Sequence, residues 1–269
     1  MLEMNLIIGG ASGYNLNELS LFISSALLNT TADLAIICDS LNLEEQFCLK
    51  RFPRIKLLRI PKLNNPREFA TLRYKAFLEY LASINREKYN MVLLSDCKDV
   101  YFQSDPFGDV NGIIFASEPR TIENCPTNRD WIMNFFPNGD DFLRKHGSEL
   151  IICCGTILGD FKSITKLLQI FTAELDMAIA KIGAIPFGLD QSMLIKLIYE
   201  NRLNLKYSIS DPCSGFATTL HYHPETPINM YGQIVDTSKT PVPVIHQIDR
   251  RPWLEKSYRE AIQLLTANK

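Results

Sequence analysis

The chain has 269 residues, of which 46% are hydrophobic and 22% are charged, and its formal net charge is -2. This length allows one α/β domain with its own core, and the composition is that of an ordinary soluble globular protein. No basic tract is found, which disfavours nucleic-acid binding, and no apolar run is long enough to predict a membrane-spanning helix.

The N-terminus and the cysteines predict the compartment. The first residues lack the basic flank and the long apolar stretch of a signal peptide. The seven cysteines are odd in number and include no CxxC pair. We therefore expect reduced thiols in a cytoplasmic protein and no structural zinc site.

In the first half of the chain, short apolar segments alternate with amphipathic ones. Strands are expected at residues 6–8, 34–38, 55–60 and 91–94, and helices after Asn15 and over residues 67–84. Asn15 and Glu18 have the spacing of a capping box at a helix start. This alternation predicts a mainly parallel sheet that is covered by helices on both faces.

The second half of the chain is less regular. Strands are expected at residues 113–116, 150–158 and 242–245, and helices at residues 161–182 and 190–200. Residues 119–138 are polar and aromatic, and they are predicted to form a long functional or mobile loop. Residues 211–252 are predicted to be mostly irregular. Because no clear linker is present, we expect a single domain over residues 1–269 with an irregular C-terminal part.

Two carboxylates follow the buried strand at residues 91–94. Asp96 and Asp99 come where this strand ends, and ligands of open α/β sheets bind beyond the carboxyl ends of the strands. Paired carboxylates suit a hard divalent cation such as Mg2+ or Mn2+, which would in turn hold a diphosphate. The alternative is that Asp96 caps a turn and Asp99 is solvated. Asp105, which precedes Pro106, is interpreted as a turn former.

His246 also follows a predicted strand. Imidazole is a frequent metal ligand, and the guanidinium groups of Arg250 and Arg251, a few residues later, match phosphate oxygens. A single His is more often structural than a ligand. The case for His246 as a metal ligand therefore depends on the neighbouring Arg pair. His221 and His223 are a second pair, for which a polar loop is the simpler interpretation.

Glycines and an Asp-Gln pair are further candidates. Gly155 would let the backbone approach a ligand or would simply make a tight turn. Asp190 is either the N-cap of a helix or, together with Gln191, a partner for a sugar hydroxyl. The glycine-rich residues 9–13 would suit phosphate, although they match neither GxGxxG nor a P-loop.

The order of these motifs resembles one family. A strand and loop, a helix with an Arg, an acidic strand end, a Gly-containing strand end, an Asp-Gln pair and a late His-Arg segment follow one another. This order resembles the retaining, metal-dependent GT-A glycosyltransferases that include lipopolysaccharide galactosyl- and glucosyltransferases and glycogenin (family 8-like). The resemblance covers nearly the whole chain through short motifs. It implies a Rossmann-like GT-A domain with a nucleotide-sugar-binding half, 1–110, and an acceptor-side half, 111–269.

The resemblance implies a metal site. In the family, a DxD motif holds Mn2+ against the diphosphate of a UDP-sugar, and a late His is a further ligand. Here Asp96 and Asp99 have DxxD spacing, with Asp99 matching the second acid, and His246 precedes Pro252-Trp253 as the family His precedes its Pro-Trp. The implied ligands are therefore Asp96, Asp99 and His246, and the implied cofactor is Mn2+ or Mg2+.

The resemblance also assigns substrate contacts. Catalytic roles are carried over to Asp190, Gln191 and Arg73, whereas Cys153 stands where the family has an Asn. Donor contacts are carried over to Gly10, Ala11, Ser12, Tyr14, Arg73, Asp96, Gly155 and Arg251. In the predicted loop 119–138, the side chains that suit an acceptor sugar are those of Arg129, Trp131 and Asn134.

The expected function is transfer of a hexose from a nucleotide diphosphate sugar, UDP-sugar by family default, to an acceptor hydroxyl with retention of configuration. The acceptor is expected to be a glycan, a lipid-linked sugar or a protein. A lipid-linked acceptor would be met at the inner face of the membrane, although no basic amphipathic stretch for docking there is evident. The alternatives are a sugar nucleotidyltransferase and a non-catalytic nucleotide-sugar-binding module.

Overall fold

The computed structural model describes residues 4–108, 110–223 and 227–267. Its centre is a seven-stranded sheet in the order β3-β2-β1-β4-β7-β6-β8. The strands are β1 (Met4–Ala11), β2 (Asp33–Cys38), β3 (Ile55–Arg59), β4 (Tyr89–Asp96), β6 (Ile113–Thr121), β7 (Leu150–Asp160) and β8 (Tyr207–Ser210). The first four are mutually parallel, β7 is antiparallel to both β4 and β6, and β8 is parallel to β6. The predicted α/β class with a mostly parallel, Rossmann-like sheet is confirmed.

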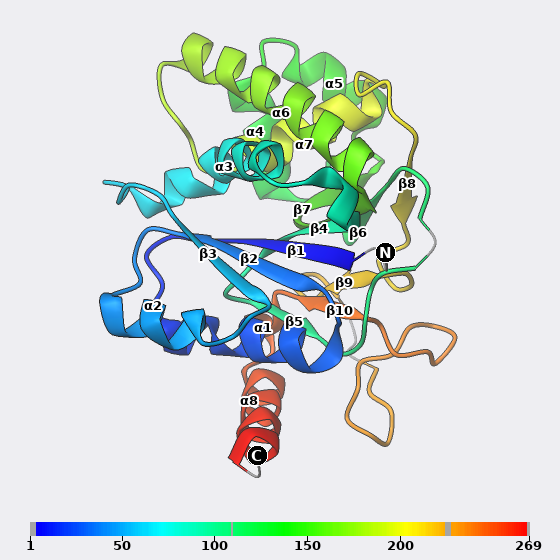
Figure 1. The fold of residues 1–269 in the computed structure, drawn as a ribbon. Helices are drawn as coiled ribbons and strands as arrows, with labels where there is room; N and C mark the ends of the chain where they lie inside the picture. Colours follow the sequence, from blue (N-terminus) through cyan, green and yellow to red (C-terminus); the bar gives the residue numbers. More distant parts are fainter. Residues whose placement is uncertain (1–3, 109, 224–226, 268–269) are drawn as a thin grey trace.

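Helices cover both faces of this sheet (Figure 1). One face carries α3 (Phe69–Ser83), α4 (Pro126–Phe135), α5 (Gly139–His146), α6 (Phe161–Ile182) and α7 (Leu189–Tyr199). The other carries α1 (Leu16–Asn29) and α2 (Leu43–Lys50). Two separate apolar clusters fill the spaces between the sheet and its two helical layers, because the buried strands present apolar side chains on both sides. The capping box of Asn15 and Glu18 is confirmed at the start of α1.

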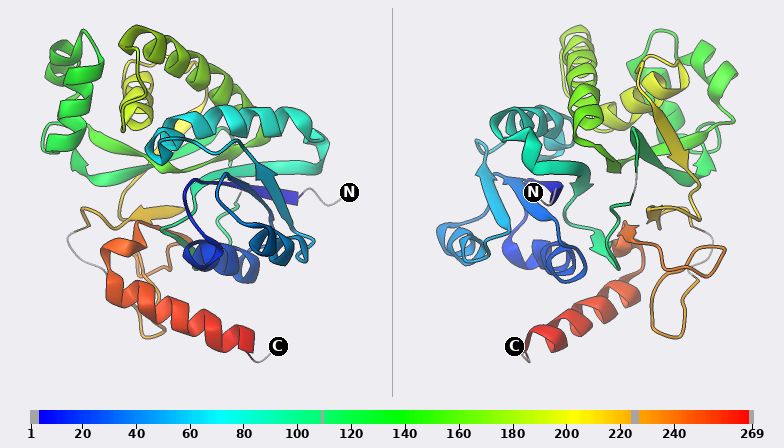
Figure 2. Two further views of the ribbon diagram at one scale, coloured as in Figure 1. Left: turned by 90° about the vertical axis from the view of Figure 1, so that its left-hand side faces the viewer. Right: turned by 45° about the vertical axis from the view of Figure 1, so that its right-hand side comes forward.

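A second sheet lies beside the α1 side of the central one. It has three strands in the order β5-β10-β9, namely β5 (Val100–Phe102), β10 (Val244–His246) and β9 (Ala217–Thr219). In this sheet His246 pairs with Val100, so a residue near the end of the chain is fixed next to the turn after β4. The final helix α8 (Pro252–Ala267) extends away from this sheet (Figure 2).

Three short 3-10 helices complete the fold: η1 (Pro66–Glu68), η2 (Arg86–Lys88) and η3 (Ile248–Arg250). All seven cysteines are free thiols. Within the described part of the chain, none of the helices has the length and apolar character needed to cross a bilayer.

The prediction of a long loop at residues 119–138 is wrong, because α4 occupies Pro126–Phe135. Proline at the first helical position is a start signal, since its fixed φ suits a helix and its missing N–H is not needed there. The polar composition of the segment conceals a buried face formed by Asn128 and Ile132. The segment still contributes to the cavity described below, but as a rigid helix.

Candidate functional site

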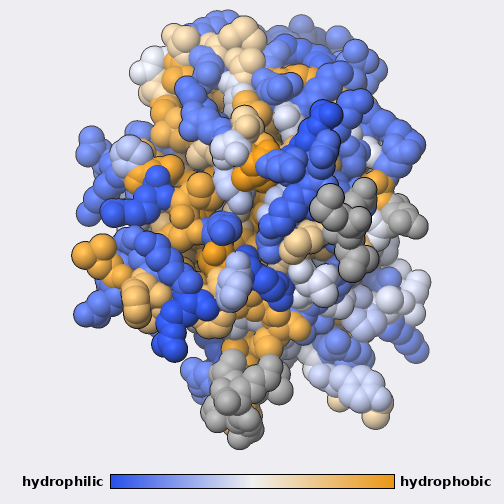
Figure 3. All heavy atoms as spheres, in the orientation of Figure 1, coloured by the Kyte–Doolittle hydropathy of each residue, from blue (hydrophilic) through white to orange (hydrophobic). Residues whose placement is uncertain are grey.

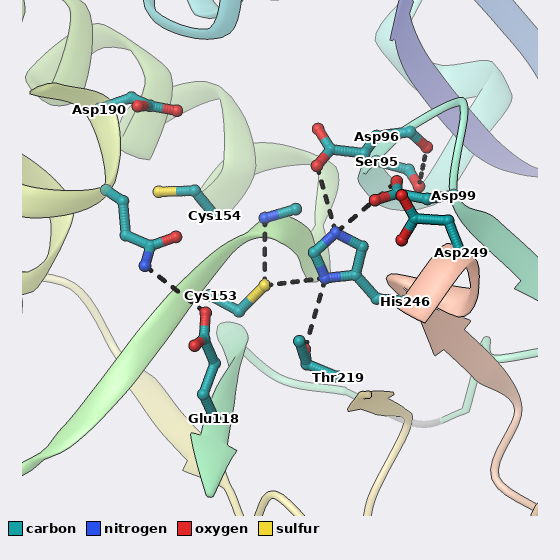
Figure 4. Close-up of polar contacts among 12 residues, drawn as sticks. Ser95, Asp96, Asp99, Glu118, Cys153, Cys154, Asp190, Thr219, His246 and Asp249 are labelled. Atoms are coloured by element: carbon teal, nitrogen blue, oxygen red, sulfur yellow. Dashed lines mark hydrogen bonds and ion pairs between the residues drawn. The ribbon is translucent and has the colours of Figure 1, made fainter. Parts of the chain in front are cut away.

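Two strand ends bring the predicted metal ligands together (Figure 4). Asp96 is the last residue of β4 and His246 the last residue of β10, while Asp99 lies in the turn between β4 and β5. The Nε2 atom of His246 lies 3.2 Å from an Asp96 carboxylate oxygen and 3.9 Å from one of Asp99. One ligand atom from each residue lies within 4.8 Å of the others. The three side chains could therefore hold one metal ion.

The other ring nitrogen of His246 is also engaged. Its Nδ1 lies 3.1 Å from Cys153 Sγ and 3.4 Å from Thr219 Oγ1. Such a partner behind a histidine fixes the ring orientation, and here it directs Nε2 toward the carboxylates. Burial opposes charge on the ring, but Cys153 and the carboxylates of Asp99 and Glu118 outweigh it and raise the pKa of His246 to about 9. At neutral pH without a metal, His246 therefore carries a proton on each ring nitrogen. A metal ion bound at Nε2 would replace the proton there.

Gly155 on β7 leaves the room that these ligands need. A Cβ on Gly155 would lie 2.3 Å and 2.4 Å from two ring atoms of His246 and 2.8 Å from a carboxylate oxygen of Asp96. A side chain there would displace both groups. The pair of carboxylates, the imidazole and this open space fit a divalent ion.

Gly155→Ala is expected to weaken Mn2+ binding roughly a hundredfold while the fold is retained. The added methyl group pushes the ring of His246 and the carboxylate of Asp96 apart, so both cannot bind one ion. Isothermal titration calorimetry measures the affinity, and thermal unfolding monitors the fold. Gly108→Ala is the matched control, because a Cβ there meets nothing within 4 Å. Unchanged affinity in Gly155→Ala would contradict the assigned ligand set.

Arg73 on α3 lies beneath the carboxylates. Its guanidinium forms an ion pair with Asp96, lies 3.7 Å from Asp190, and donates to the Tyr74 hydroxyl at 3.0 Å. Burial raises the pKa of Asp190, whereas the charge of Arg73 opposes this rise. Arg73 therefore compensates two acidic groups, of which Asp190 is almost completely buried.

A cavity of about 530 Å³ opens over this cluster. Most of the residues predicted from sequence line it, namely Gly10, Ser12, Tyr14, Arg73, Asp96, Asp99, Trp131, Gly155, Asp190, Gln191 and His246. The structure thus gathers donor-side, metal and acceptor-side candidates from both halves of the chain in one place.

Four predicted residues do not line this cavity. Ala11 is buried in the core, where it packs among the residues under α1. Arg129 and Asn134 are exposed on α4, and Arg129 pairs with its neighbour Asp130 at 3.3 Å. Arg251 donates to the backbone oxygen of His223 at 2.8 Å, and Arg250 lines the cavity in its place.

An aromatic pair forms one rim of the cavity. Trp131 on α4 and Phe187 pack edge to face with ring centroids 5.7 Å apart. Gly188 has φ 88°, and a Cβ on it would lie 2.2 Å from the indole ring, so the Trp131 ring packs directly against the Gly188 backbone.

Gly188 is also the N-cap of α7, so the interpretation of Asp190 as N-cap is wrong. Asp190 lies within the first turn of the helix.

Sequence reasoning missed Glu118, a buried acid on β6. The amide nitrogen of Gln191 donates to it at 3.5 Å and to Asn128 at 3.0 Å. Burial raises the pKa of Glu118 to about 7, although His246 and Gln191 oppose the rise. Glu118 follows the apolar residues 113–116, so the rule that singled out Asp96 would have found it. Other lining residues that were missed are Arg67, Lys98, Asn128, Phe187 and Tyr222.

Glu118→Gln is expected to raise the free energy of unfolding by about 3 kcal/mol above about pH 8 and to change it little below about pH 4. In the wild type, the folded pKa of Glu118, about 7, exceeds its ordinary value of 4.5. The folded state therefore binds more protons between these values, and stability falls as pH rises through them. Gln cannot ionise, so the variant does not lose this part of its stability as pH rises. Urea unfolding across this pH range measures it, with Glu79→Gln on the exposed face of α3 as control. Parallel curves for wild type and Glu118→Gln would contradict the prediction.

No protein-family model matches the chain, and no curated protein matches it by sequence. The function is therefore inferred from the cavity itself. Its floor combines three candidate metal ligands with a buried Arg, and its rim carries the aromatic rings of Trp131 and Phe187.

Proposed function

We propose that this chain is a metal-dependent glycosyltransferase that moves a hexose from a nucleotide diphosphate sugar, a UDP-sugar first, to an acceptor hydroxyl with retention of configuration. The observation that carries the proposal is the cluster of Asp96, Asp99 and His246 beside Arg73, on the floor of a cavity of about 530 Å³. That volume is in the range of sites for small molecules and cofactors. A GT-A arrangement and a cytoplasmic location, where thiols stay reduced, belong to the same proposal.

The donor diphosphate binds against the acidic cluster. Asp96, Asp99 and His246 would hold a divalent ion, which would supply positive charge to stabilise the leaving diphosphate. Lys98 and Arg250, which line the cavity, contact the phosphate oxygens in the role first assigned to Arg251. Positive groups fixed before the reaction stabilise developing charge without reorganisation.

The nucleoside and the sugar lie on opposite sides of this cluster. Gly10, Ser12 and Tyr14 line the nucleoside side, where the Tyr14 ring stacks on the base. On the sugar side, Asp190 is held by Arg73 and orients the donor hydroxyls. Gln191, whose amide nitrogen donates to Asn128 and Glu118, contributes its carbonyl oxygen beside the reacting carbon.

The Trp131 and Phe187 rings bind the acceptor. Stacking of an aromatic ring on the apolar face of a sugar contributes enough that Trp131→Ala is expected to raise the acceptor KM about tenfold. Hydrolysis of the donor by water is expected to stay near the wild-type rate, because Trp131 lies on the rim. Trp253→Ala is the control, since Trp253 is exposed on α8 and does not line the cavity. Equal losses in hydrolysis and transfer would place Trp131 on the donor side instead.

Donor hydrolysis tests the proposal directly. A panel of nucleotide sugars is incubated with the protein in Mn2+, in Mg2+ and in EDTA, and nucleoside diphosphate release is measured. Slow, metal-dependent release from one donor is expected. Release of pyrophosphate from a nucleoside triphosphate and sugar phosphate would identify a nucleotidyltransferase. Metal-dependent binding without turnover would identify a binding module, and no binding at all would overturn every nucleotide-sugar function.

A further inference from the structure

A basic and apolar surface lies on the α2 and β3 side of the molecule. Residues 47–67 contain seven Lys and Arg and no Asp or Glu, in a chain whose net charge is -2. The cations are Lys50, Arg51, Arg54, Lys56, Arg59, Lys62 and Arg67. The expectation that no basic tract is present overlooked this segment, because apolar residues separate the cations along the chain.

The cations of this segment remain available for a partner. The guanidinium of Arg54 donates to the backbone oxygens of Leu27, Thr30 and Ala32, which is a structural role. The other six are exposed. Among the described residues, no acidic side chain forms an ion pair with any of these six. A negatively charged partner or salt would lessen their mutual repulsion.

Three large apolar side chains share this surface. Leu43 and Phe47, one turn apart on α2, are 77% and 70% exposed, and Phe52 is 48% exposed. The residues that α2 turns inward are Gln46 and Leu49 instead. In Figure 3, hydrophobic and hydrophilic residues lie side by side where α2 and β3 face the viewer. Grouped exposed apolar side chains of this size mark an interaction site.

This surface reaches the entrance of the cavity. Ser40, just before α2, donates to the backbone oxygen of Tyr14 at 2.7 Å, and Tyr14 lines the cavity. At the other end of the segment, Pro66 and Arg67 line the cavity as well. A partner that covers the surface therefore lies next to the cavity entrance.

We propose that the exposed side chains of residues 43–67, which we call the α2–β3 face, dock on a membrane that contains anionic lipid. Lys and Arg side chains match the negative headgroups, and Leu43, Phe47 and Phe52 enter the boundary between headgroups and acyl chains. A nucleic acid or an acidic peptide matches the cations but offers no apolar layer for three neighbouring side chains. The inference stands independently of sugar transfer, because it uses none of the metal-site residues.

Vesicle co-sedimentation tests this docking. The full chain is mixed with vesicles of phosphatidylcholine alone or with phosphatidylglycerol added, at low and at high salt. Binding is expected only with phosphatidylglycerol, and it is expected to weaken with salt. Lys50→Glu/Arg51→Glu is expected to reduce the partition constant at least roughly twenty-five-fold, because loss of each Lys or Arg alone costs about fivefold. Leu43→Ser/Phe47→Ser is expected to reduce it roughly tenfold.

Matched substitutions on α6 are the controls. Met177→Ser removes an exposed apolar side chain, and Lys166→Glu/Lys181→Glu reverses two exposed cations, all on the opposite side of the central sheet from α2. These variants are expected to bind vesicles as the wild type does. Absence of binding to either vesicle, or equal losses in the α2 and α6 variants, would overturn the proposal. Self-association that Leu43→Ser/Phe47→Ser abolishes, without vesicle binding, would make the face an interface between copies and also overturn it. Binding to a soluble polyanion such as heparin but not to vesicles would do the same.

Discussion

Asp99→Asn is expected to lower metal-dependent donor turnover roughly a thousandfold. Asn has the size of Asp but lacks the negative charge that attracts a divalent ion. The backbone at this position is held independently of the side chain, because the Asp99 carbonyl accepts the N–H of Ile248 at 3.1 Å. The substitution is therefore expected to remove charge from the site without changing the turn that joins β4 to β5.

The measurement is donor hydrolysis as a function of Mn2+ concentration. A ligand role predicts that the Mn2+ concentration for half-maximal activity rises together with the loss in rate. Asp105→Asn is the matched control, since Asp105 accepts the backbone N–H groups of Phe107 at 2.9 Å, as expected of a turn former, and of Thr31 at 3.4 Å, and lies outside the metal cluster. Full metal-dependent activity in Asp99→Asn would show that Asp99 is not a metal ligand. Asp96 and His246 would then be the only two of the proposed ligands left.

The positions of Asp96 and His246 could be predicted from the sequence because one physical rule covers both. An apolar strand that ends in a polar residue delivers that residue to the edge of a sheet, where ligands bind. The rule does not say which strand ends meet. Their meeting depends on the pairing of β5 with β10, which sets His246 opposite Val100 across 146 positions of the chain. No local pattern encodes such a pairing.

The choice between Arg250 and Arg251 could not be made from spacing. Gln247, directly after β10, has φ 56° in the left-handed region and redirects the chain into the short helix η3. As a result Arg250 lines the cavity, while Arg251 turns toward the backbone oxygen of His223. A single unusual backbone conformation decides this, and the sequence around it contains no glycine to signal it.

The acceptor-side residues show how an incorrect element changes a site. If residues 119–138 were a loop, Arg129, Trp131 and Asn134 could all face one ligand. In α4, successive residues are about 100° apart around the axis, because a turn takes about 3.6 residues. Trp131 therefore shares its cavity-facing side with Thr127 and Asn128, and Arg129 faces elsewhere. Asn134 is on the side of Thr127 but lies about two turns further along the helix, and it does not line the cavity. The missed helix is the reason that two of these three residues do not line the cavity.

Arg73→Met is expected to lower the free energy of unfolding by about 4 kcal/mol at neutral pH. Met fills similar space but leaves Asp190 as a buried carboxylate without its neighbouring cation. Loss of one member of a buried ion pair is costly because the remaining charge has neither water nor a partner. Asp96, the second partner of Arg73, is partly exposed and can be solvated, so most of the expected cost comes from Asp190.

The pH dependence of this loss identifies its cause. Without Arg73, burial holds the pKa of Asp190 further above its ordinary value of 3.8. The folded state then keeps a proton that the unfolded state releases, so stability falls as pH rises above that value and the deficit shrinks as pH falls toward it. Adding Asp190→Asn is expected to recover most of the loss at neutral pH. Arg129→Met, which breaks the exposed pair with Asp130, is expected to cost less than about 1 kcal/mol. A deficit independent of pH, without recovery in the double variant, would mean that Arg73 stabilises the fold by packing rather than by its charge.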